Sequence, residues 1–542
     1  MPRHLANNNL TLPFLLLIIT CITFWQTLSY EFINYDDPEF INAKMVQQGL
    51  SWEGFQWSWT HVGRLNLWHP ATWWSFQLDS TWGEGQSFSY RVSNLLLHAA
   101  NSILIFFLAK SWLKSAPLAF LIALLFVLHP SGVQSVAWIS ERKGLLSSFF
   151  ILASLLTWNH WLTKRKTWSY LSTILLALCA TLCKPIAVVL PILLLIEQFR
   201  LQNTEDKTEI WMQWIKPYLP FFALSFLLGI LTLSLHAEGG LASQGVQQSS
   251  FLERLYLLPS MALYYLNNSF LGGDHRLLVS TPNQPLQIAI ILPFLGTITV
   301  LTFWLWSLKK NSVLAILAII SAITIILPVS GVISLSHYYV ADRYLYLPRA
   351  FFWISLFALL QTSFGKWFPQ AQRTSWKAFG ILLSILGIGY LFTTQQTVLK
   401  RYENSLSLFS YESQQDPFSV VASLQYADAL SEKERIREAI HTLQCASRYS
   451  AKSYEIHFNL ALLHLNREET KEAINHFRKA TEATHVPAPD AHLNLAILLG
   501  RQNRIYELIE VTEAGITLFP NHRQLSELNQ RAKKQTPQRL FK

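Results

Sequence analysis

Two adjacent acids, Asp36 and Asp37, open the first long polar stretch of the chain, shortly after an apolar run over residues 10–29. Adjacent carboxylates repel each other, so the pKa of one of them rises, which suits it to act as a general base. The same residues also fit a helix cap, because an Asp before a proline, here Pro38, commonly begins a helix. The residues alone leave base and cap as equal alternatives.

Cations lie beside apolar segments at three further places. They are Arg142, Lys143, Lys184 and Arg343, and the acids next to them are Glu141 and Asp342. An Arg side chain offers a phosphate a planar pair of donors, and a Lys side chain offers it a point charge. A cation recessed among apolar helices is costly to bury, so it is a functional candidate by default. The plainer alternatives are ion pairs with lipid headgroups, a lysine that reaches along its stem to the membrane interface, and a structural Asp–Arg pair. The sequence has no glycine-rich phosphate loop, His/Cys metal pattern or Ser-His-Asp arrangement.

Tryptophan is abundant in the first polar stretch. Seven Trp lie between residues 52 and 82, together with the His69-Pro70 pair. This composition is typical of an amphipathic helix in the membrane interface with an aromatic belt. It is also compatible with a wall on which a sugar ring stacks, and the two interpretations do not exclude each other.

The composition of the chain divides it into two parts. Of 542 residues, 51% are hydrophobic and 14% charged, against about 25% charged in a soluble domain. Residues 1–400 hold all 20 Trp but only 41 charges, whereas residues 401–542 hold 35 charges. This indicates a membrane domain followed by a soluble domain, and excludes a wholly soluble enzyme, a disulfide scaffold and a disordered chain. The net charge of +10 lies almost entirely in the membrane part, so it is a topology signal and predicts no nucleic-acid partner.

Apolar runs predict about eleven membrane-spanning helices. They cover residues 10–29, 92–109, 117–128, 145–162, 169–182, 186–199, 217–235, 286–307, 313–330, 347–362 and 378–393. The stretch 169–199 fits one kinked helix or two short ones, and 251–271 could also span. The distribution of Lys and Arg favours an inner N-terminus and an outer soluble domain. The long outer loops are then residues 30–91, 129–144, 236–285 and 331–346, so function is expected on the outer face.

The soluble domain is repetitive. The segment Glu455–Leu463 aligns with Asp490–Leu498 at an offset of 35 residues, and each copy is followed by a second helical pattern. A period near 34 with small residues at helix crossings is typical of tetratricopeptide repeats, which stack into an α-solenoid. About three repeats are expected. Such a surface commonly binds peptides or assembles partners, and the pattern does not identify the ligand.

Several motifs together resemble a known family. The segments NYDDPEFI, WHPATWWS, HPSGVQSVAWISERKGLLS, KPIAVVLP and ADRYLYLP, followed by the repeats, are similar to integral-membrane GT-C glycosyltransferases with repeat tails. The nearest relatives are bacterial proteins similar to the eukaryotic transmembrane-and-tetratricopeptide-repeat O-mannosyltransferases. Where that family usually has Lys-Asp after Glu-Arg, this chain has Lys143-Gly144, which removes an acid from the pattern.

The resemblance implies an all-α GT-C fold and an inverting transfer of a sugar, mannose or another monosaccharide, from a polyprenyl-phosphate donor to a hydroxyl acceptor such as Ser or Thr of a protein. Asp37 would be the base and Asp36 its partner. The phosphate would be held by Arg142, Lys143, Lys184 and Arg343, oriented by Glu141 and Asp342. The substrate pocket would include His69, Tyr35, His129 and Tyr344. No metal or other cofactor is expected, although paired acids suit a divalent metal. The repeats would present the acceptor polypeptide.

Other functions stay open at this point. A lipid-linked oligosaccharide ligase or polymerase would share these features, and a non-catalytic membrane scaffold would use only the repeats. A flippase would place charges in mid-helix along a conduit, whereas here they cluster in the loops. The compact loops favour a bacterial inner membrane with periplasmic repeats, and the alternative is the endoplasmic reticulum with lumenal repeats.

Overall fold

The computed structural model describes residues 10–63, 68–201, 215–238, 251–270, 273–279, 312–330, 340–367, 373–483 and 488–535, and these are helical with no strand. The chain forms two compact units, Met1–Asn404 and Ser405–Lys542.

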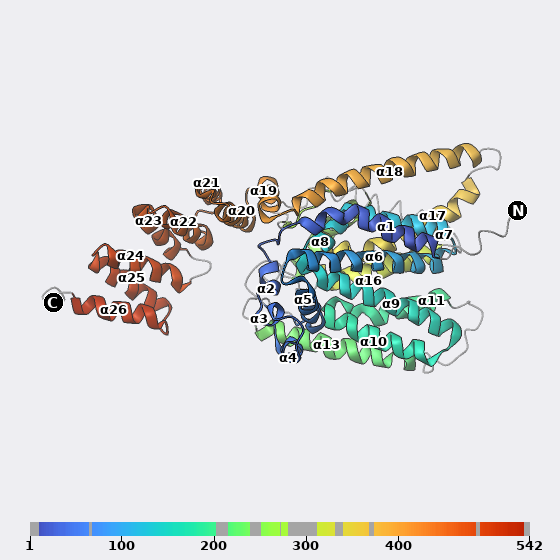
Figure 1. Ribbon diagram of the computed structural model, residues 1–542, viewed down its shortest axis with the longest axis horizontal. Helices are drawn as coiled ribbons and strands as arrows, with labels where there is room; N and C mark the ends of the chain where they lie inside the picture. The colour runs from blue at the N-terminus through green and yellow to red at the C-terminus, as the bar shows by residue number, and fades with distance from the viewer. Residues whose placement is uncertain are drawn as a thin grey trace. The chain divides into compact units, whose positions relative to one another are not determined.

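The first unit is a bundle of apolar helices that run side by side (Figure 1). Within the described residues, four segments are long and apolar enough to cross a membrane. They are Thr11–Ser29, Ser87–Leu113, Ile139–Lys164 and Lys216–Leu235. A fifth exists if α7, Ala116–Leu128, is joined with its continuation Pro130–Ala137, to which it is bent by 63°. The unit is therefore an integral membrane domain. The predicted number of about eleven spans is not reached by this measure, and the predicted span 286–307 lies outside the described residues.

The remaining helices of the bundle are shorter or less uniformly apolar. They are α10 Thr167–Cys183, α11 Leu190–Leu201, α14 Phe251–Phe270, α16 Ser312–Ile326, α17 Pro348–Trp367 and α18 Arg373–Arg401. The same unit contains α1 Thr11–Phe24, α6 Ser87–Leu113, α9 Arg142–Lys164 and α13 Leu219–Glu238.

The stretch 169–199 contains two helices. The helix α10 ends at Cys183, Lys184 is extended with φ −157° and ψ 130°, and a 3-10 turn, η5 Pro185–Val189, leads into α11. Pro185 causes the break, because a proline disfavours helical backbone in the residue before it and has no N–H to donate. The break leaves Lys184 at the end of an apolar helix, still inside the bundle.

The first polar stretch folds into four short helices that pack on one another. They are α2 Asp37–Ile41, α3 Lys44–Gln47, α4 Trp52–Thr60 and α5 Pro70–Gly83. Phe40, Val46, Trp73 and Phe76 form their buried core together with Tyr90. Other tryptophans of this region, such as Trp52 and Trp82, are exposed. The region therefore has both a packed interior and an exposed aromatic face, which supports the interfacial interpretation.

The segment 129–142 differs from the outer loop that the sequence suggested. It folds into η3 Pro130–Gly132, α8 Val133–Ala137 and η4 Ile139–Glu141, and it runs directly into α9. Every residue from 129 to 142 is buried. Small and apolar residues let this segment enter the bundle, and its charged end is then placed among the helices.

The second unit consists of consecutive helix pairs. After α19, Ser405–Gln415, the pairs are α20 Val420–Glu432 with α21 Ile436–Ser447, α22 Tyr454–Asn466 with α23 Thr470–Thr481, and α24 Pro489–Arg501 with α25 Ile505–Leu518, followed by α26 Arg523–Gln535. The turns inside the pairs each contain a left-handed residue, Glu434, Glu468 or Asn503, at intervals of 34 and 35 residues. The helices thus repeat with the period of the sequence. Ala461, Ala473 and Ala496 are fully buried where helices cross.

We predict that the small residues at these crossings limit the stability of the second unit. Ala461→Leu should reduce its free energy of unfolding by about 1–3 kcal/mol, because extra methylenes in a packed core force neighbours to move. The neighbouring Leu462 is 41% exposed and supplies the control. Leu462→Ala should change stability by less than about 0.5 kcal/mol. Pulse proteolysis of the full-length protein in urea measures both variants, and equal effects would contradict the packing argument.

Candidate active site

Asp37 is completely buried and fully engaged by hydrogen bonds. Its Oδ2 accepts a hydrogen bond from the Ile33 N–H at 2.9 Å, and its Oδ1 accepts from the N–H of Ser140 at 2.9 Å and from the Ser140 hydroxyl. Burial raises the pKa of Asp37 above its ordinary value, while these hydrogen bonds and the charge of Arg91 oppose the shift. The carboxylate therefore joins the start of α2 to η4.

Asp36 lies at the N-cap of α2 and is partly exposed, whereas Asp37 is buried. The Asp36 side chain makes no capping hydrogen bond to the helix. The two acids consequently occupy different environments: Asp37 is buried and bonded to Ile33 and Ser140, and Asp36 is partly exposed. Neither side chain makes the helix-capping hydrogen bond that the sequence offered as one alternative.

Arg91, in the first turns of α6, holds the chain that leads to the acids. It is buried and donates from Nε to the Tyr30 carbonyl at 3.0 Å, from one amino group to the Ala137 carbonyl at 2.7 Å, and from the other to the Glu31 carbonyl. It therefore connects the first polar stretch to α8. The sequence analysis did not identify Arg91 as a site residue. Its position at the beginning of a long apolar helix, where a cation is expensive to bury, is the signal that could have found it.

A cluster of cations surrounds the buried carboxylate of Glu141. Its Oε2 lies 3.2 Å from Lys184 Nζ, and its Oε1 lies 3.5 Å from Arg343 Nε and 3.7 Å from Lys143 Nζ. The three cationic side chains are only 8–15% exposed. We call Lys143, Lys184 and Arg343 the cation cluster. They come from three separate helix ends, α9, α10 and η9 Asp342–Leu345.

The three cations of the cluster carry more positive charge than the single carboxylate of Glu141 carries negative charge. They lie at a site that is largely removed from water, where Coulomb interactions are strong. A Cβ added to Gly144 would lie 3.2 Å from Glu141 Oε2 and 3.6 Å from Lys184 Nζ. An acid at this position would stand beside Lys184, so the glycine keeps the excess charge high. Such a site suits a phosphate group.

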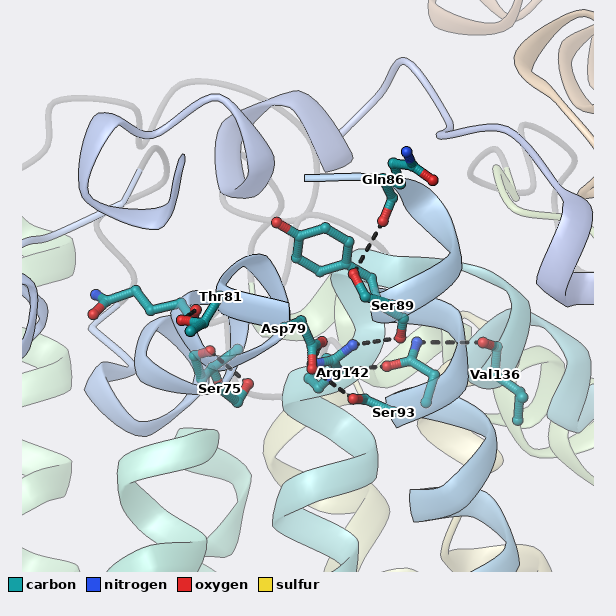
Figure 2. A network of polar contacts seen from close by, with 12 residues as sticks. Ser75, Asp79, Thr81, Gln86, Ser89, Ser93, Val136 and Arg142 are labelled. Atoms are coloured by element: carbon teal, nitrogen blue, oxygen red, sulfur yellow. Dashed lines mark hydrogen bonds and ion pairs between the residues drawn. The ribbon is translucent and has the colours of Figure 1, made fainter. Parts of the chain in front are cut away.

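Arg142 lies away from this cluster, although the sequence suggested it as a phosphate ligand. Its guanidinium pairs with Asp79 (Figure 2). It also donates to Asn94 Oδ1 and to the Tyr90 carbonyl, both at 2.5 Å, and lies over the ring of Phe76. Successive side chains on a helix point about 100° apart, so Arg142 and Lys143 cannot face the same group. Arg142 fastens α9 to α5 and α6 instead.

Asp342 also differs from the expected arrangement. Its Oδ1 accepts hydrogen bonds from the Tyr264 hydroxyl and from Asn268 Nδ2, both at 2.7 Å, and its Oδ2 lies 2.5 Å from His275 Nδ1. No ion pair joins Asp342 to the adjacent Arg343 among the described residues. The backbone N–H of Arg343 donates to Gln134 Oε1 at 2.9 Å. Glu141 contacts three of the predicted phosphate ligands, whereas Asp342 contacts none.

The predicted pocket residues fall into two groups. The ring centroids of Tyr35 and Trp138 lie 6.0 Å apart, and the Arg343 guanidinium lies over the rings of both Trp138 and Tyr344. These aromatic side chains therefore border the cation cluster. His129 is buried elsewhere, with its Nδ1 2.9 Å from Ser131 Oγ and its ring edge-on to that of His275.

His69 is buried beside the cation cluster, stacked on Trp73 and close to Phe40. Burial lowers the pKa of His69 to about 3, with a further contribution from the positive charge of Lys143. The ring is therefore neutral at physiological pH. Its Nε2 is buried without a hydrogen-bond partner among the described residues, so a neutral polar atom is left next to the cations.

Within the described part of the chain, no group of three His, Cys, Asp or Glu side chains could hold a metal ion. Asp36 and Asp37 do not converge on one point, because Asp37 turns into the protein.

The Arg142–Asp79 pair should contribute strongly to stability. Asp79→Ala is expected to cost about 3–5 kcal/mol, because it leaves a buried guanidinium without its counter-ion. The Arg276–Asp274 pair, whose side chains are 23% and 46% exposed, lies nearer to solvent and provides the control, so Arg276→Gln should cost no more than about 1 kcal/mol. Thermal unfolding in detergent distinguishes the two, and a small effect of Asp79→Ala would show that the pair is dispensable.

The depressed pKa of His69 should make the protein acid-sensitive. Its stabilising contribution is complete above the unfolded value of 6.5 and is lost as the pH falls from there toward about 3, because protonation then favours the unfolded chain. His69→Phe should flatten the fall in unfolding temperature between pH 6.5 and 4, measured on the purified protein. An unchanged pH profile would mean that His69 can be charged without cost.

No known protein-family model matches this chain. It is 31% identical over 126 residues to a protein O-mannosyl-transferase Tmtc1 of Drosophila melanogaster, an alignment that covers 23% of this chain and 15% of the relative. It is 35% identical over 130 residues to a protein O-mannosyl-transferase TMTC2 of Mus musculus, which covers 23% of this chain and 16% of the relative. It is 25% identical over 208 residues to a TMTC1 protein of Homo sapiens, covering 35% of this chain and 24% of the relative. The chain thus matches less than a quarter of the length of these relatives. It is a membrane protein with distant, partial homology to the TMTC O-mannosyl-transferases.

Proposed function

We propose that the protein is an inverting GT-C glycosyltransferase that moves a monosaccharide from a polyprenyl-phosphate donor to a hydroxyl group of a protein. The single observation that carries this proposal is the cation cluster: three cations from three helix ends converge on one buried acid. The relatives named above are protein O-mannosyl-transferases, which supports mannose as the first sugar to test and a protein as the acceptor.

The cation cluster would hold the phosphate that links sugar and lipid. Lys184 lies at the end of an apolar helix, so it can meet a headgroup whose lipid tail stays among the helices. The excess charge of the cluster would stabilise the leaving phosphate as the sugar departs, and such stabilisation is commonly the largest catalytic term. Lys143 and Arg343 would share this role, and Glu141 would keep all three cations in place.

The transfer would be a single displacement. The acceptor hydroxyl gives its proton to a carboxylate, its oxygen bonds to the anomeric carbon, and the bond from that carbon to the phosphate oxygen breaks, so the electron pair leaves with the phosphate. Attack opposite to the leaving group inverts the anomeric centre. We assign the base to Asp36, because Asp37 is buried and both of its oxygens already accept hydrogen bonds. Asp37 would fix the turn that presents Asp36. The family resemblance implies the opposite order, with Asp37 as the base and Asp36 as its partner.

The aromatic and neutral groups next to the cations would bind the sugar. His69 offers a neutral nitrogen that has no hydrogen-bond partner in the described part of the chain. Tyr35 and Tyr344 flank the cluster through Trp138 and Arg343. Sugar rings stack well on such side chains, and neutral groups donate or accept hydrogen bonds without adding charge. His129 would belong to the surrounding framework.

The second unit would be a tetratricopeptide solenoid that presents acceptor polypeptide. Its helix pairs recur every 34 or 35 residues, which is the spacing of that repeat. The localisation that we propose is a bacterial inner membrane with the repeats in the periplasm; the alternative is the endoplasmic reticulum with lumenal repeats. The chemistry described above uses only side chains of the chain, and we propose that it needs no metal.

Sugar transfer by the purified protein tests the proposal. A panel of polyprenyl-phosphate monosaccharides and a protein extract from the same cells serve as substrates, with and without a chelator. Asp36→Asn should lower kcat by about 100-fold or more while the protein stays folded, because general-base catalysis is lost. Lys184→Met should weaken binding of the donor. Asp274→Asn, an exposed acid outside the site, is the control and should retain full activity.

Each other outcome has a distinct meaning. Loss of activity with Asp37→Asn but not with Asp36→Asn, at unchanged unfolding temperature, would return the base to Asp37. Transfer only from oligosaccharide donors would make the protein a ligase. No transfer from any donor by well-folded wild-type protein would favour a scaffold.

A further inference from the structure

The residue next to Arg343 is held by a separate set of contacts that the proposed reaction does not use. The buried Asp342 carboxylate accepts hydrogen bonds from Tyr264 and Asn268 on α14, and it contacts His275 in the segment 273–279. All of these partners lie more than 60 residues away in the sequence. Asp342 is therefore the point where α14 and the segment 273–279 are joined to η9.

Asp342 and Arg343 point in different directions from the same turn. The turn η9 is a 3-10 helix, in which successive side chains are about 120° apart. The Asp342 side chain meets α14 and His275, whereas Arg343 reaches Glu141 and lies over Trp138. The backbone N–H of Arg343 is fixed by Gln134. A movement of Asp342 would therefore rotate or shift Arg343 relative to Glu141.

His275 is the most constrained of the three partners of Asp342. Its backbone carbonyl accepts a hydrogen bond from Arg401 of α18 at 3.0 Å, its ring is edge-on to that of His129, and its Nδ1 lies 2.5 Å from Asp342. Its Nε2 is buried without a hydrogen-bond partner among the described residues. A histidine held at its backbone and packed at its ring can place a carboxylate accurately, as the outer partners of metal and catalytic ligands do.

The local chain is shaped for this contact. A Cβ added to Gly273 would overlap Asn268 Oδ1 at 1.9 Å and Asn267 Nδ2 at 2.6 Å. Only glycine lets the segment 273–279 pack this closely on the end of α14. Asn268 in turn donates to Asp342, so the close approach brings the His275 and Asn268 side chains to the same carboxylate.

We propose that His275 is a positioning residue for the donor phosphate: it holds Asp342, and through it sets Arg343 in the cation cluster. This inference rests on the proposed function, because it assumes that the cluster binds the phosphate of a polyprenyl-phosphate lipid. His275 itself touches neither Glu141 nor any cation of the cluster among its hydrogen bonds and ring contacts in the described structure. Its effect on the ligand passes through the turn η9.

Replacing His275 in two ways tests the proposal. His275→Leu removes the contact to Asp342, whereas His275→Asn keeps a donor near the position of Nδ1. Purified variants are titrated with polyprenyl phosphate alone, and also assayed for sugar transfer. His275→Leu should weaken binding of polyprenyl phosphate and raise the KM for the donor by about tenfold, with the KM for the protein acceptor unchanged. His275→Asn should restore binding to within about twofold of the wild type.

A structural role alone would give a different pattern. Asp274→Asn, in the same segment but exposed, should leave binding unchanged, and unfolding temperatures identify any variant that fails to fold. If His275→Leu is misfolded, Tyr264→Phe removes a single donor to Asp342 and should likewise weaken binding of polyprenyl phosphate.

Equal binding of polyprenyl phosphate by wild type and a folded His275→Leu, or a fall in kcat with no change in binding, would overturn the inference alone. Wild-type protein that binds polyprenyl phosphate but transfers no sugar would overturn the proposed function and leave the positioning role standing. Wild-type protein that neither binds nor transfers would overturn both.

Discussion

Three positive charges meet around the carboxylate of Glu141, and the surrounding elements of the membrane unit must hold them there. Like charges repel strongly where water is scarce, so Lys143, Lys184 and Arg343 would separate unless the backbone held them. The bundle does this at three helix ends. The proline break fixes Lys184, the buried segment before α9 fixes Glu141 and Lys143, and the turn η9 fixes Arg343. The acid partly neutralises the repulsion, and the helices supply the rest of the restraint.

A second layer of buried polar contacts supports this arrangement without touching the cations. Arg142 with Asp79 fastens the start of α9, Asp37 with Ser140 fastens η4 to the first polar stretch, and Arg91 fastens that stretch to α8. Each contact joins segments far apart in the sequence. These buried contacts hold irregular segments of the bundle in place, because non-helical backbone at membrane depth is tolerated only where it is packed in protein or lines a water-filled cavity.

The sequence predicted features that depend on neighbouring residues, but it did not predict contacts between segments that are far apart in the chain. The division into a membrane part and a helical repeat part followed from composition and period, and Lys184 stood out because a proline interrupts an apolar run beside it. The choice between Arg142 and Lys143 could not be made, because moving the start of α9 by one residue turns every side chain by about 100°. The partners of Asp342 could not be predicted either, because Tyr264 and His275 lie 78 and 67 residues before it in the sequence. The different exposure of Asp36 and Asp37 required the contact with Ser140, 103 residues after Asp37.

The charge imbalance of the cation cluster has a consequence for the order of events in a catalytic cycle. A sugar-linked lipid phosphate is a diester with one negative charge, whereas the lipid phosphate left after transfer is a monoester with a second pKa near 6 and nearly two charges. A cluster of three cations around one acid would attract the spent carrier more strongly than the loaded one. Retention of the product would then limit turnover, and Gly144, by keeping an acid away from Lys184, would strengthen that retention. The turnover rate of such an enzyme would depend on how quickly the lipid phosphate left after transfer is removed into the membrane.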